Sequence, residues 1–98
     1  MIFLYSQKAL TGGLSTKLAV TTGVSAQTAV LSDSYAVVVM PTVDVYFRRG
    51  VNPTAVSDGT DQFLLANITY RLTGFGGLDK LSFIASTSGG SVYITAGA

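Results

Sequence analysis

The chain contains no histidine, cysteine, tryptophan or glutamate among its 98 residues. Most catalytic and metal-binding sites use histidine, cysteine or glutamate side chains, so their absence removes the common nucleophile and base pairs and zinc ligand sets. The absence of cysteine also excludes disulfide bonds and leaves the cellular compartment undecided. The sequence therefore predicts a protein that is not an enzyme and that has no metal site and no cofactor.

Charged residues are also scarce, at 11% of the chain compared with about 25% in an average soluble domain. The six basic residues are spread along the sequence and form no stripe that would neutralise a phosphate backbone, so we expect no direct nucleic-acid binding. Hydrophobic residues make up 48% of the chain. So few charges predict a surface that is partly shared with other protein, as in a homo-oligomer, although a monomer with a surface rich in serine and threonine remains an alternative.

Apolar runs are short. The longest are residues 1–5 and residues 35–40, and both are far below the length of a membrane span or a signal-peptide core. We therefore expect no membrane insertion and no export signal.

Valine, isoleucine and threonine are frequent, and glycine or small polar residues interrupt the chain at short intervals. This pattern predicts about eight short strands, arranged as an all-β sandwich, jelly roll or small barrel in a single domain over residues 1–98. The expected strands cover residues 1–5, 15–22, 24–31, 35–40, 42–48, 80–86 and 92–95, together with residues 63–66 and 68–73, which form two strands or one bent strand. Residues 51–62 are expected to form a surface loop, and residues 88–90 a tight hairpin turn.

Alternation within the expected strands predicts which side chains form the core. Residues 35–40 are apolar on both faces, which indicates either a central strand covered twice or a strand covered on one side by another subunit. Pro41 is expected to mark a corner. The side chains expected to point inward in three other strands are Val43, Val45, Phe47, Leu81, Phe83, Ala85, Val92 and Ile94.

Two features are candidate protein interfaces. The first is the N-terminal apolar run, which is either the first strand of the sandwich or, within residues 1–13, an arm that adds to the sheet edge of a neighbour. The second is a pair of adjacent arginines whose guanidinium groups suit carboxylates of a partner, with a solvated strand end as the alternative. The candidate residues are Met1, Ile2, Phe3, Leu4, Tyr5, Arg48 and Arg49.

The second half of the chain resembles the capsid decoration (cement) proteins and related minor virion proteins of tailed phages. The resemblance rests on VDVYFRRG from residue 43, NPTA from 52, FLLANITYRL from 63, LDKLSFIAS from 78 and GSVYITAG from 90. It implies a jelly-roll-like antiparallel β-sandwich, commonly a homotrimer, that binds the outside of an assembled shell.

This resemblance implies a location on the virion capsid surface, after synthesis in the host cytoplasm, with the major capsid protein and further copies of the chain as partners. Two alternatives stay open. One is a carbohydrate- or receptor-binding jelly roll on the virion, for which the pair Tyr46 and Asp44 is the candidate sugar site. The other is a tail or neck completion protein that forms a ring.

Overall fold

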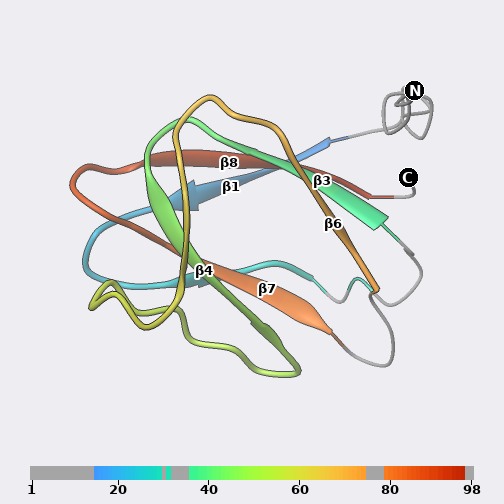
Figure 1. The fold of residues 1–98 in the computed structure, drawn as a ribbon, viewed down its shortest axis with the longest axis horizontal. Coiled ribbons are helices and arrows are strands. Elements are labelled where there is room, and N and C mark those ends of the chain that lie inside the picture. The colour runs from blue at the N-terminus through green and yellow to red at the C-terminus, as the bar shows by residue number, and fades with distance from the viewer. Residues whose placement is uncertain (1–14, 30, 32–35, 75–78, 97–98) are drawn as a thin grey trace.

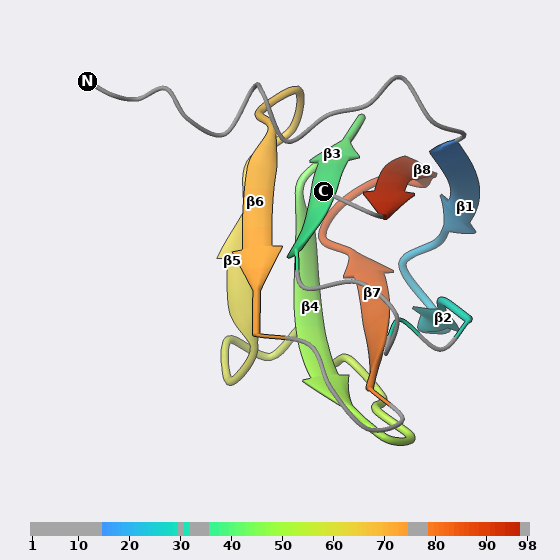
Figure 2. The same ribbon diagram turned by 90° about the vertical axis from the view of Figure 1, so that its right-hand side faces the viewer.

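The computed structural model describes residues 15–29, 31, 36–74 and 79–96. It contains eight strands in two four-stranded antiparallel sheets that pack face to face (Figures 1 and 2). Sheet 1 has the order β1-β8-β3-β6 and sheet 2 the order β2-β7-β4-β5. The strands are β1 (Ser15–Val20), β2 (Ala26–Gln27), β3 (Ala36–Pro41), β4 (Val45–Gly50), β5 (Gln62–Leu64), β6 (Tyr70–Thr73), β7 (Lys80–Ala85) and β8 (Gly90–Ala96).

The strand order is that of a jelly roll, which confirms the predicted all-β, jelly-roll-like sandwich. Strands that follow one another in sequence lie in different sheets, except for β4 and β5, which pair directly. In Figure 2, β5 and β6 lie at the left side of the sandwich, with β5 behind β6, and β1 and β2 lie at the right side. Within each sheet, in contrast, strands far apart in the sequence pair with one another, as β1 does with β8.

The core lies between the inner faces of the two sheets. Phe83, Val45 and Val92 have no exposed surface, and the ring of Phe47 packs 6.1 Å from that of Phe83, measured between ring centroids. The predicted alternation is confirmed in β4, β7 and β8, because each inward residue named above is buried or packs against the buried cluster. Burial of these aliphatic and aromatic side chains is the main force that holds the sheets together.

The apolar strand β3 is central in sheet 1, between β8 and β6. Val37 and Val39 belong to the core, whereas Ala36 and Val38 lie on the opposite face and are also buried, with 0% and 9% exposed. Met40, the third residue on that opposite face, is partly exposed. Strand β3 is therefore central, as the first of the two interpretations predicts, and most of its outer face is covered within one chain.

The loop at residues 51–61 packs against the outer face of sheet 2. The Ala55 backbone N–H donates a hydrogen bond to the Ser82 hydroxyl oxygen at 2.9 Å, and both residues are buried. The Gln27 side chain donates to Asn52 Oδ1 at 2.9 Å and to the Pro53 carbonyl at 2.7 Å. The loop is thus fixed to β2 and β7, and it covers part of a face that the sequence pattern predicts to be exposed.

Two details of the predicted strands are wrong. Residues 88–90 do not close a hairpin, because β7 belongs to sheet 2 and β8 to sheet 1, so this turn crosses from one layer to the other. The strand expected at residues 24–31 is reduced to β2, and Val24 is 74% exposed. The Thr21 hydroxyl explains the second difference, because it donates to the Val24 carbonyl at 3.2 Å in a local turn that interrupts the extended backbone.

Candidate interaction site between β4, β5 and β6

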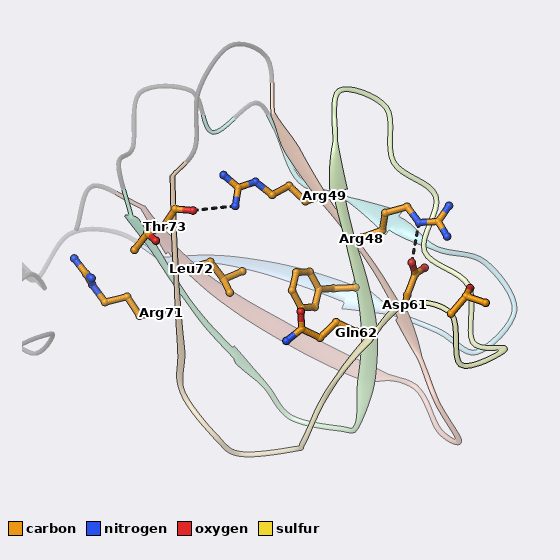
Figure 3. Close-up of a pocket in the computed structure, with 9 residues that line it drawn as sticks. Arg48, Arg49, Asp61, Gln62, Arg71, Leu72 and Thr73 are labelled. Atoms are coloured by element: carbon orange, nitrogen blue, oxygen red, sulfur yellow. Dashed lines mark hydrogen bonds and ion pairs between the residues drawn. The ribbon is translucent and has the colours of Figure 1, made fainter.

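Arg48 and Arg49 are adjacent on β4, and their side chains therefore leave opposite faces of sheet 2. Figure 3 shows Arg48 extending toward Asp61 and Arg49 extending toward Thr73 of sheet 1. The structure does not bring the two guanidinium groups together. A single carboxylate of a partner could therefore bind only one of the two guanidinium groups.

Arg48 forms an ion pair with Asp61. Its Nε donates to Asp61 Oδ1 at 2.8 Å, and Asp61 Oδ2 accepts a hydrogen bond from the Val56 backbone N–H at 2.7 Å. The Asp61 side chain is only 8% exposed, whereas that of Arg48 is 43% exposed. The carboxylate is thus fixed by the 51–61 loop, and it in turn fixes the direction of the arginine.

Arg49 connects the two sheets. Its Nη1 donates to the backbone carbonyl of Thr73 in β6 at 2.9 Å, and its Nε lies 3.6 Å from Asp79 Oδ2. Both contacts are partly exposed, so each stabilises the fold modestly. The contacts give Arg49 a role in joining β4 to β6 at the side of the sandwich.

A cavity of about 470 Å³ lies between β4, β5 and β6, and all three arginines of the chain line it. Phe47 and Leu72 supply apolar lining, and Asp61 is the one carboxylate among the described residues of the lining. Figure 3 shows the third arginine, Arg71, extending from β6 away from the other two. The sequence pattern shows the basic residues as scattered and does not predict that all three arginines line one cavity. That requires the strand order, in which β5 and β6 are edge strands of the two sheets.

An exposed apolar stretch lies next to this cavity. Phe63 of β5 is 42% exposed, and Leu65 and Ile68, which follow it in the chain, are 49% and 43% exposed. The Tyr46 ring packs against that of Phe63 with 5.1 Å between centroids and 57° between ring planes. Large exposed apolar side chains gathered in one segment are typical of protein-binding surfaces.

The candidate sugar site at Tyr46 and Asp44 is already occupied by contacts within the chain. Asp44 Oδ1 accepts a hydrogen bond from the Ala66 backbone N–H at 2.8 Å, and one side of Tyr46 contacts Phe63. The carboxylate therefore orders the connection between β5 and β6. This arrangement gives the sugar-binding alternative no support.

A second cavity, of about 530 Å³, lies between residues 22–25 and residues 54–58, with Ile84 in its lining. Asp58 at its rim accepts hydrogen bonds from the Thr60 hydroxyl at 2.6 Å and the Thr60 backbone N–H at 3.0 Å. These bonds, the hydroxyl bond first, hold the pKa of Asp58 below its usual value of 3.8. Asp58 therefore stabilises a turn within the 51–61 loop.

Within the described parts of the chain, no three His, Cys, Asp or Glu side chains are grouped so that they could hold a metal ion. In the same residues, no helix is long and apolar enough to cross a membrane. Met1, Ile2, Phe3, Leu4 and Tyr5 lie outside the described residues, so their assignment to an interface stays a prediction.

No protein-family model, curated protein or solved structure matches this chain. The resemblance to phage decoration proteins therefore stays a hypothesis that rests on the sequence segments quoted above.

Proposed function

We propose that this chain is a non-enzymatic virion structural protein, a decoration protein that binds the outer shell of a tailed-phage head and bridges neighbouring major capsid subunits. The observation that carries this proposal is the exposed apolar stretch of Phe63, Leu65 and Ile68, on a chain with few charges. A surface of this composition suits contact with another protein. The jelly-roll-like fold is compatible with the role but does not select it, because this fold serves many functions.

A homotrimer is part of the proposal. One such patch would form a small interface of modest affinity, whereas three patches on one rigid body act together and raise the apparent affinity by about 10²- to 10⁴-fold. A weak contact per subunit is then sufficient. Sedimentation of the purified protein tests this step, and a ring of six or twelve subunits would favour the neck-protein alternative.

The decisive experiment mixes the purified protein with mature heads that lack it, then measures binding and the temperature or osmotic shock at which the shells burst. We expect saturable binding and shells that burst at a higher temperature. The double variant Phe63→Ser with Leu65→Ser should lose binding, whereas Val24→Ser, which changes an exposed apolar residue elsewhere on the surface, should bind as the native protein does. Absence of binding by the native protein would overturn the proposal.

The N-terminal segment is tested separately. Deletion of residues 1–5 is expected to weaken trimer or shell contact, because this apolar run is the candidate arm. An unchanged assembly state together with unchanged shell affinity would show that the arm hypothesis is wrong, while leaving the surface at Phe63 and Leu65 under its own test.

A further inference from the structure

We propose that the surface formed by Arg48, Tyr46 and Phe63 recognises a carboxylate side chain of a partner protein, presented in an acidic segment. This inference rests on the proposed function, because it names the chemistry of the partner at the same surface. Arg48 is the residue that would bind the carboxylate, and the two aromatic residues are the apolar platform beside it.

The Arg48 side chain is held in a fixed orientation. Its Nε is held by Asp61 at 2.8 Å, and the second oxygen of that carboxylate is held by the Val56 N–H at 2.7 Å. Within the described residues, no acceptor bonds the two terminal nitrogens of Arg48, and 43% of its side chain is exposed. A guanidinium already held in place loses less side-chain entropy when its remaining N–H groups bind a partner.

Two aromatic residues lie on the same face of sheet 2 as Arg48. Tyr46 lies two residues before Arg48 on β4, so both side chains leave the same face of sheet 2, and Phe63 is paired with Tyr46 across the β4–β5 ladder. Arginine and tyrosine in one partly buried patch are typical of the residues that dominate binding energy. When a partner covers Tyr46 and Phe63, it also removes water from the arginine, which strengthens its hydrogen bond to a carboxylate.

Positive charge exceeds negative charge around this surface. Among the described residues, three arginines and one carboxylate, Asp61, line the adjacent cavity, and Asp79 pairs with Arg49. The Asp61 carboxylate is nearly buried and has hydrogen bonds to both of its oxygens. A partner that offers a carboxylate therefore complements the local excess of positive charge. A planar carboxylate also matches the two terminal N–H groups of a guanidinium, which can donate to both of its oxygens.

The test uses the ¹⁵N-labelled full chain and two synthetic nonapeptides. One peptide carries two adjacent aspartates between valine and leucine residues, and the other has asparagine in place of both aspartates. Two-dimensional NMR is expected to show shifts of Arg48 Nε and of the Tyr46 and Phe63 amides with the acidic peptide. Binding of the asparagine peptide should be weaker by about ten-fold or more, the usual effect of losing a hydrogen bond to a charged group.

Matched variants identify the residue responsible. Arg48→Gln should weaken acidic-peptide binding by about ten-fold or more, and Arg48→Lys should recover only part of it, because lysine lacks the planar pair of donors. Lys17→Gln, at an exposed cation of β1 on the other sheet, should bind the peptide like the native chain. Thermal unfolding of each variant shows that it is folded.

Three results would overturn the inference: no shift with millimolar acidic peptide, equal binding of both peptides, or shifts caused by a single-stranded oligonucleotide and not by peptide. The head-binding assay separates this failure from failure of the proposed function. If Arg48→Gln binds heads like the native protein while the Phe63 and Leu65 double variant does not, the surface is correct and the carboxylate chemistry is wrong.

Discussion

The backbone N–H of Ala55 donates a hydrogen bond to the hydroxyl of Ser82 across the outer face of sheet 2, at 2.9 Å and with neither residue exposed to solvent beyond 2%. This bond joins the middle of the 51–61 loop to the middle of β7. It makes the loop part of the folded structure, and the stability of the domain should depend on it.

Replacing Ser82 with alanine is expected to reduce the free energy of unfolding by about 1–3 kcal/mol, because the Ala55 N–H would be buried without an acceptor. Urea denaturation measures the change. Ser88→Ala is the matched control, since Ser88 is exposed and its loss should change stability by less than about 0.5 kcal/mol. Equal stability of the two variants would contradict the structural role of the loop.

Two phenylalanines provide a paired test of the core. Phe83 has no exposed surface and contacts Phe47, whereas Phe63 is 42% exposed. Phe83→Leu should destabilise the protein markedly more than Phe63→Leu, because only the first leaves a space inside a packed core. Thermal unfolding would detect the difference, and a larger loss at Phe63 would mean that sheet 2 faces the other way.

Gly90 lies where the chain enters β8, and a side chain has no room there. A Cβ atom at this position would lie 2.8 Å from both Thr42 Oγ1 and Val43 Cγ1, and Thr42 Oγ1 is itself bonded to the Ser91 N–H at 3.0 Å. Gly90→Ala should therefore cost about 1–3 kcal/mol of stability. At Gly23 an added Cβ meets nothing within 4 Å, so Gly23→Ala should be tolerated; similar losses in both variants would refute the packing at Gly90.

The lowered pKa of Asp58 predicts an acid-dependent contribution to stability. Because the Thr60 hydrogen bonds favour the ionised carboxylate, this contribution is fully present above pH 3.8 and is lost as the pH falls through the lower pKa of the folded state. Thr60→Val should raise the pKa of Asp58 toward its usual value, as followed by NMR of the side-chain carboxyl carbon. An unchanged titration in this variant would show that the hydroxyl does not stabilise the carboxylate.

The inward faces of the strands could be predicted because alternation is local. Residues such as Phe83, Val92 and Ile94 reveal their burial through their immediate neighbours in the sequence. The assignment of strands to sheets could not be predicted in this way. Ser88 and Gly89 indicate a tight turn, but turn residues do not specify whether the next strand pairs beside β7 or crosses to the other layer.

The candidate site also could not be predicted from local sequence, because it depends on which strands lie in which sheet. Arg48 and Arg49 are predicted to form one interface because they are adjacent in the sequence. In the folded chain, their side chains point in different directions. Arg71 lines the same cavity because β5 and β6 are edge strands of the two sheets at the same side of the sandwich. Alternation with Leu81 and Phe83 places Ser82 on the outer face of β7, and its complete burial depends on a loop that begins some thirty residues earlier in the chain.

The place of β8 in sheet 1 has a consequence for synthesis of the protein on the ribosome. β8 is translated after β1 and β3, yet it lies between them and pairs with both. A nascent chain that ends before residue 90 has no strand to join these two, so sheet 1 can close only after β8 has been synthesised. Among the described strands, the β4–β5 pair is the one that can form early from consecutive segments, so sheet 2 should begin to form before sheet 1 is complete.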